Sequence, residues 1–115
     1  MDQKKIEELV AAYPEAEAQI KEQAEKHGAI GVVDTIGGLA IFRRPKPAEY
    51  ERHLALLFDE KSRPKAAGFL ARACVVYPAR EAFDAWCTEY PGIPIACADV
   101  LSDLAGASKR ERGKE

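Results

Sequence analysis

The chain has 115 residues, with 17 basic and 19 acidic side chains and a formal net charge of −2. This length allows one domain with a modest hydrophobic core, because a domain of this size withdraws only about two-thirds of its extended-chain surface from water. The acidic balance argues against nucleic acid as a partner, since neutralising phosphates over a whole surface needs a basic excess. No uninterrupted apolar run approaches the ~20 residues of a membrane-spanning helix, so we expect no membrane span.

The cysteine content favours a reducing compartment. Cys74, Cys87 and Cys97 are odd in number and widely spaced, which does not make a disulfide framework. Their spacings also lack the short C-x₂₋₄-C pair that organises two thiolates around zinc. We therefore expect buried, reduced thiols without a metal. The N-terminal residues lack the apolar stretch of a signal peptide, which favours a cytoplasmic location.

The first predicted element is an amphipathic helix capped by Asp2. Its apolar residues follow the i, i+3, i+4, i+7 pattern: Ile6, Leu9, Val10 and Tyr13. Pro14 should interrupt this helix, and a second helix should run to His27 and end at Gly28. Residues 1–28 are therefore expected to form an N-terminal helical segment.

Residues 29–44 predict an antiparallel β-hairpin, because β-branched residues rise there, charges nearly vanish and Gly37-Gly38 separates two apolar runs. With these glycines as a two-residue loop, Ile36 would pair with Leu39. Val33 and Phe42 would then share one face, and the other face would hold Val32, Ile36, Leu39 and Ile41. Both faces are apolar, and we expect a small helical domain to cover only one of them.

The rest of the chain has a helical pattern punctuated by proline. We expect helices from Pro47 to about residue 60, from Pro64 to Tyr77, over 79–90, and from the Pro91–Pro94 turn to Gly106. The hairpin should pack on the helices that carry Leu54, Phe58, Leu70, Phe83 and Trp86.

These elements predict the fold class and its boundaries. Residues 29–106 should form a mostly helical α+β domain with one hairpin, and the charged residues 107–115 should be a disordered tail. Charge is polarised along the sequence, with +4 over 43–72 and −4 over 73–106. Such polarity favours steering of an acidic partner or self-association, although a solvated surface without a partner explains it equally well.

Catalytic patterns are absent from the sequence. Ser62, Ser102 and Ser108 do not lie in a G-x-S-x-G elbow, and the glycines do not form a phosphate-binding loop. His27 and His53 fall on different elements, and we expect His53 at a helix surface or boundary. The sequence therefore predicts a protein that is not an enzyme and needs no cofactor.

Several short motifs occur in a characteristic order after the first strand of the hairpin. They are Phe42-Arg43-Arg44-Pro45, Pro47-Ala48-Glu49-Tyr50-Glu51-Arg52, Ala73-Cys74-Val75-Val76-Tyr77-Pro78, Glu89-Tyr90-Pro91-Gly92-Ile93 and Leu104-Ala105-Gly106. This order over about residues 30–106 resembles the small tail assembly chaperones of tailed bacteriophages and prophages. They similarly carry an RRP…EY start, a VVYP helix end and a PG turn. Residues 1–28 have no counterpart in this resemblance.

The resemblance implies a non-enzymatic protein of the bacterial host cytoplasm. Such chaperones bind the long apolar tape measure protein, keep it soluble and deliver it to the tail tube subunits, and in some families a frameshift appends a second domain. Two alternatives are a small structural virion protein (head, connector or tail adaptor) and a small helical regulator or nucleic-acid binder. As the client-binding surface we predict the hairpin and the cationic connector after it: Val32, Ile36, Leu39, Ile41, Arg43, Arg44, Lys46 and Arg52.

Overall fold

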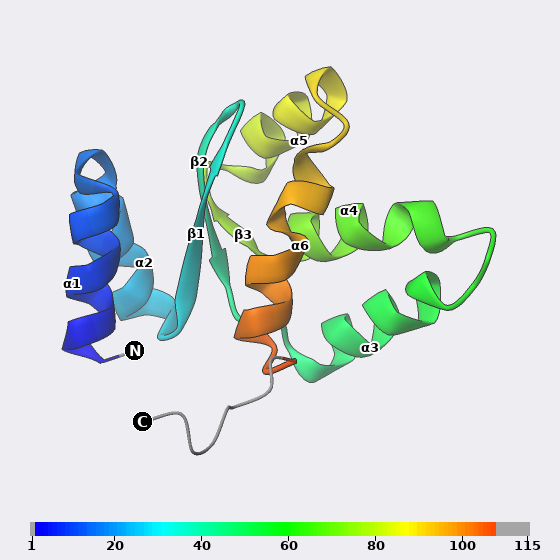
Figure 1. Cartoon of the computed structure of the whole chain (residues 1–115), viewed down its shortest axis with the longest axis horizontal. Helices are drawn as coiled ribbons and strands as arrows, with labels where there is room; N and C mark the ends of the chain where they lie inside the picture. The colour runs from blue at the N-terminus through cyan, green and yellow to red at the C-terminus, as the bar shows by residue number, and fades with distance from the viewer. Residues whose placement is uncertain (1, 108–115) are drawn as a thin grey trace, which may run out of the picture.

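The computed structural model describes residues 2–107, which form three layers (Figure 1). A three-stranded antiparallel sheet separates an N-terminal pair of helices from the helices that follow the sheet in sequence. The mostly helical α+β class predicted from the sequence is confirmed. Of the predicted tail (107–115), residues 108–115 lie outside the described residues. Within 2–107, no helix combines the length and apolar character that a bilayer crossing needs.

The N-terminal layer consists of α1 (Gln3–Ala12), a 3₁₀ turn (Pro14–Ala16) and α2 (Glu17–His27). Asp2 caps α1 as expected, and its Oδ1 accepts a hydrogen bond of 2.8 Å from the Lys5 N–H. Pro14 interrupts the helical run. Gly28 ends α2 with a φ of 77°, in the left-handed region that glycine tolerates.

Strands β1 (Ile30–Thr35) and β2 (Gly38–Arg43) form the predicted hairpin, but with Ile36-Gly37 as the loop. The closing pair is Thr35 with Gly38, not Ile36 with Leu39. Thr35 Oγ1 accepts hydrogen bonds of 3.1 Å from the N–H groups of Gly37 and Gly38, and it donates one of 2.7 Å to the Gly38 carbonyl. The predicted register is therefore wrong by two residues. The strand side chains nevertheless lie on the faces predicted for them, because a two-residue shift in pairing keeps each side chain on the same side of the sheet.

A third strand, β3 (Val75–Tyr77), pairs antiparallel with β2 and makes it the central strand. The prediction of a helix from Pro64 to Tyr77 is wrong in its last turn, since α4 (Ala66–Cys74) ends at Cys74. Two adjacent β-branched residues, Val75 and Val76, favour extended backbone. The open edge of β2 supplies the hydrogen-bond partners that turn this preference into a strand.

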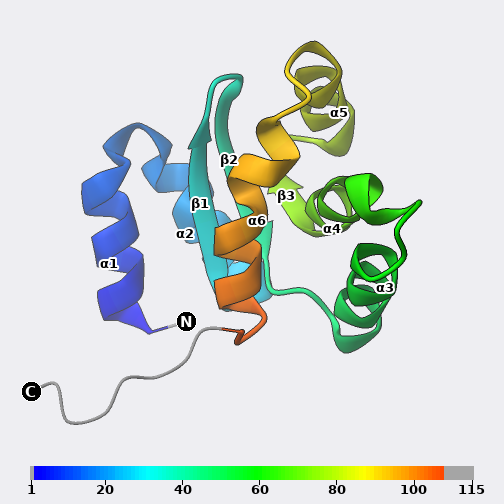
Figure 2. The ribbon, with the colours of Figure 1, turned by 45° about the vertical axis from the view of Figure 1, so that its right-hand side comes forward.

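The third layer is helical and lies on the opposite side of the sheet from α1 and α2 (Figure 2). Helix α6 lies against β1 and α4, and α3 packs against α4. The bounds of the remaining elements are α3 (Pro47–Leu57), a 3₁₀ turn (Arg63–Lys65), α5 (Arg80–Glu89) and α6 (Ile93–Leu104).

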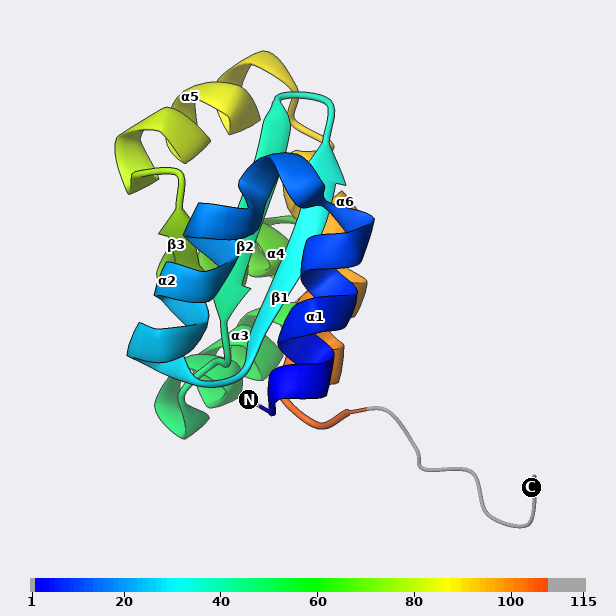
Figure 3. The same cartoon turned by 90° about the vertical axis from the view of Figure 1, so that its left-hand side faces the viewer.

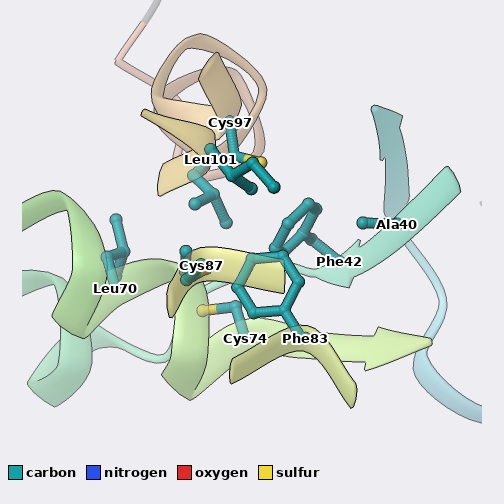
Figure 4. Packing of buried hydrophobic residues seen from close by; sticks show 10 residues of the cluster. Ala40, Phe42, Leu70, Cys74, Phe83, Cys87, Cys97 and Leu101 are labelled. Atoms are coloured by element: carbon teal, nitrogen blue, oxygen red, sulfur yellow. The ribbon is translucent and has the colours of Figure 1, made fainter. Parts of the chain in front are cut away.

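One face of the sheet packs against α4, α5 and α6. Phe42 of β2 meets Phe83 of α5 edge to face, with ring centroids 5.8 Å apart, and both side chains are fully buried (Figure 4). Leu70 and Leu101 complete the packing from α4 and α6. All three cysteines are free and buried, as predicted, and they belong to this cluster.

The other face packs against α1 and α2 (Figure 3), so the expectation that only one face is covered is wrong. Ile41 and Val32 on the sheet and Ile20 on α2 are buried in a second apolar cluster. The physical reason lies in residues 2–28, which supply a second helical layer on this face of the sheet.

The predicted placements of Phe58, Leu54 and His53 need correction. Phe58 stands at the end of α3 with 77% of its surface exposed, whereas Trp86 is half-buried and packs against the hairpin loop and the first apolar cluster. Leu54 is half-buried too. His53 is buried rather than at a surface, because its Nδ1 lies 3.0 Å from the Ala66 carbonyl where α3 meets α4.

Candidate functional site

The predicted client surface divides into buried and exposed parts. Val32 and Ile41 lie beneath the N-terminal helices, with 7% and 0% of their surfaces exposed, so they are not an open surface. Ile36 projects from the loop with 75% exposed, and Leu39 is half-buried. The apolar half of the predicted site is therefore mostly core.

Arg43 is held in place by the fold. Its two Nη atoms donate hydrogen bonds of 2.9 and 2.7 Å to the Glu49 carboxylate, and Nη2 also donates one of 2.8 Å to the Ala73 carbonyl. Both side chains are largely buried, and the hydrogen bond from Arg43 holds the pKa of Glu49 below its usual value. Arg43 thus clamps the end of β2 to the start of α3 and the end of α4.

The other three predicted cations diverge. Arg44 Nε donates a hydrogen bond of 2.9 Å to the carbonyl of Leu104, at the end of α6. Lys46 is exposed before α3, and its backbone N–H donates to Glu49 Oε1 at 2.8 Å. Arg52 is exposed on α3. Arg44 faces a concave surface.

That concave surface, here called the edge groove, follows the start of β1 between α1 and α6. It has a volume of about 500 Å³. Its lining residues are Asp2, Lys5, Glu8, Leu9, Ala29, Ile30, Gly31, Arg44, Val100, Asp103 and Leu104. The groove therefore joins the three layers of the fold at the outer edge of the sheet.

The edge groove combines apolar side chains with charged ones. Leu9, Ile30 and Leu104 supply apolar surface, whereas Lys5 and Arg44 supply positive charge among the acidic lining residues. Among residues 2–107, strand β1 pairs only with β2, so alternate backbone groups of β1 point away from the sheet toward this side. Such a groove suits a segment with apolar anchors and polar flanks.

Gly31 allows α6 to form one wall of the groove. A Cβ atom there would overlap Val100 Cγ1 and lie 3.2 Å from Leu104 Cδ1. The close approach of α6 to β1 therefore requires a residue without a side chain at this position. No local sequence pattern indicates this role of Gly31, because the requirement arises from a helix some 70 residues later in the chain.

Two smaller grooves flank α5. One of about 460 Å³ includes Tyr77 and Trp86 and carries the carboxylates of Glu15 and Asp34. The other, about 450 Å³, lies between α4 and the turn before α6, and it is lined by apolar residues together with Lys65 and Arg72. Both grooves assemble from segments far apart in sequence, so no local motif could have indicated them.

Residues 2–107 contain no cluster of three or more His, Cys, Asp or Glu side chains that could hold a metal ion. Burial raises the pKa of Cys74 to about 11 and that of Cys97 to about 12, so both remain neutral thiols at physiological pH.

Comparison with known proteins gives a fold relative and a family. The chain is similar to the uncharacterised protein RBSTP2171 from Bacillus stearothermophilus, with a TM-score of 0.66 and 25% identity over 82% of this chain and 98% of that one. No curated protein matches it significantly. Residues 34–114 match the family model DUF6848, a domain of unknown function. Since the match spans more than half of the sequence, the chain belongs to this family.

Proposed function

We propose that this protein is a non-enzymatic assembly chaperone that binds an apolar segment of a client protein. The proposal extends the resemblance of residues 30–106 to phage tail assembly chaperones, whose client is the tape measure protein and whose assembly partners are the tail tube subunits. In this proposal the client is held in the edge groove, and Arg44 pairs with acidic positions that flank the client's apolar anchors.

The observation that carries the proposal is the composition of the edge groove. Its apolar surface lies beside the unpaired edge of β1. Arg44 also lines the groove, where its side chain bonds to the end of α6. A long apolar helix needs a partner that covers its apolar side and tolerates its polar side. A groove with apolar walls and charged side chains of both signs meets both requirements.

The test is co-expression with the tape measure protein encoded in the same genome, with the soluble fraction of that protein as the readout. We expect the wild-type chain to raise this fraction several-fold over an empty vector. Arg44→Glu should lose most of the gain, because it places a like charge opposite acidic client positions. Arg52→Glu makes the same charge change on an exposed part of α3 outside the groove, and it should behave as wild type.

Each outcome has a separate meaning. No gain in soluble tape measure protein with the wild-type chain would refute the chaperone function. An undiminished gain with a folded Arg44→Glu variant would show that the client does not bind in the edge groove. Mass spectrometry of finished particles adds a further check, since a chaperone leaves the particle whereas a head, connector or tail adaptor protein stays in it.

A further inference from the structure

Helix α1 is the most shallowly packed of the six α-helices in residues 2–107. Each of α2 to α6 contains at least one buried residue, whereas α1 contains none. Its apolar residues Ile6, Leu9 and Val10, with Tyr13 after it, are only half-buried. The helix therefore contacts the remainder of the fold through one apolar stripe whose side chains are only half-buried.

The surface beneath α1 is strongly apolar. The stripe packs against a cluster whose buried members include Ile20 of α2 and Ile30 and Val32 of β1. Figure 3 shows α1 lying beside α2 and along β1, so that it also forms one side of the edge groove. A ten-residue helix is marginal in isolation, and α1 therefore depends on this docking for its helical structure.

We propose that α1 occupies the client's place and that a client helix binds by replacing it. This inference rests on the proposed chaperone function and specifies its partner. The partner is an amphipathic helix with aliphatic residues at i, i+3 and i+4 and an aromatic residue at i+7. Ile6, Leu9, Val10 and Tyr13 present this spacing to the cluster, which is the anchor pattern of helices bound in grooves.

The shallow packing of α1 favours this exchange, because it lowers the free energy needed to undock the helix. Segments with few buried contacts open locally at a lower free energy than global unfolding, and α1 has the fewest buried residues of these helices. While no client is bound, α1 packs against the cluster that contains Ile30 and Val32 and removes part of this apolar surface from water. The edge groove gives a client access to β1 from one side of α1, and departure of Leu9 with α1 would widen it.

The first test uses a labelled synthetic peptide of residues 2–13 as the client probe, added to the full-length chain. Leu9→Glu places a carboxylate in the apolar stripe and should undock α1. Ala11→Glu introduces the same side chain at an exposed position of the same helix. We expect the probe to bind the Leu9→Glu variant about tenfold or more tightly than wild type, because the fraction of molecules with a vacant site rises. The Ala11→Glu variant should match wild type.

The second test is hydrogen–deuterium exchange of the wild-type chain with and without saturating probe. We expect the backbone amides of residues 5–12 in the chain to lose protection, while those of β1 and β2 keep theirs. The inference is overturned if α1 amides stay protected in the complex, or if the probe binds neither wild type nor a folded Leu9→Glu variant. Should Leu9→Glu fail to fold, the exchange experiment on wild type decides the matter alone. Failure here leaves the co-expression result standing, since a client can be held in the edge groove with α1 docked.

Discussion

Replacing Gly31 by alanine tests how closely α6 is held against β1. The new methyl group would overlap Val100 Cγ1 and lie 3.2 Å from Leu104 Cδ1, inside the ~3.5–4.0 Å of ordinary carbon contact. Gly31 is not among the glycines with positive φ, so Gly31→Ala should gain about 0.4–1 kcal/mol from the lower entropy of the unfolded chain. Overpacking costs about 1–3 kcal/mol and outweighs that gain. We expect a net loss of about 1–2 kcal/mol in the free energy of unfolding, from urea titration followed by Trp86 fluorescence.

A second substitution isolates the cause. Val100→Ala alone should cost about 1 kcal/mol, because it removes two half-buried methyl groups. It also creates the space that the new methyl at position 31 needs. The Gly31→Ala/Val100→Ala variant should therefore be more stable than the sum of the single changes predicts, by about 1 kcal/mol. Strict additivity, or a Gly31→Ala variant more stable than wild type, would refute the close contact between β1 and α6.

The other predictions concern the core, the clamp and the thiols. Phe83→Ala should lower the free energy of unfolding by about 3–5 kcal/mol, whereas Phe58→Ala should change it by less than about 0.5, because Phe83 is fully buried and Phe58 is 77% exposed. Glu49→Gln should cost about 1 kcal/mol at pH 7, since Arg43 lowers the pKa of this carboxyl. That difference is present above the unfolded pKa of about 4.3 and should vanish as pH falls through the lower folded value, in urea titrations across pH. Cys97 should resist iodoacetamide at pH 8 until urea unfolds the chain, because burial raises its thiol pKa to about 12; rapid labelling of folded protein would contradict this.

Local chemistry was sufficient to predict most elements of the fold. Asp2 and Pro14 mark the ends of α1 by hydrogen bonding and sterics that involve only neighbouring residues. The hairpin was predicted for the same reason, but its register was not. The competing interaction is that of the Thr35 hydroxyl, which accepts hydrogen bonds from both glycine N–H groups. It places the loop one residue nearer the N-terminus, and this shifts the pairing register by two residues. Strand β3 was missed because its identity depends on the edge of β2, which no local pattern shows.

The candidate site was much less accessible to sequence reasoning. Arg43 and Arg44 are adjacent and chemically identical, yet Glu49 holds the first in a clamp and the second lies at a groove. Which arginine is held by a carboxylate depends on the position of α3, and this position is set by tertiary packing. The polarised charge is also modified by the fold, because Arg72 of the basic segment pairs with Asp84 of the acidic one at 2.9 Å.

The position of α1 links the proposed client binding to the protection of the sheet. A three-stranded sheet has two edges, and here one of them is β3, which has only three residues. The other is the six-residue β1, whose only charged side chain is Asp34, so its protection cannot come from its own charges. The flanking helices must supply it. Helix α6 contacts β1, and α1, which contains no buried residue, lines the edge groove beside the start of this strand. Undocking α1 should therefore expose the β1 edge together with its apolar face. On this argument, the Leu9→Glu variant should both bind the helical probe more tightly and self-associate at high concentration in analytical ultracentrifugation. A variant that binds the probe tightly but stays strictly monomeric would show that α6 alone protects the edge.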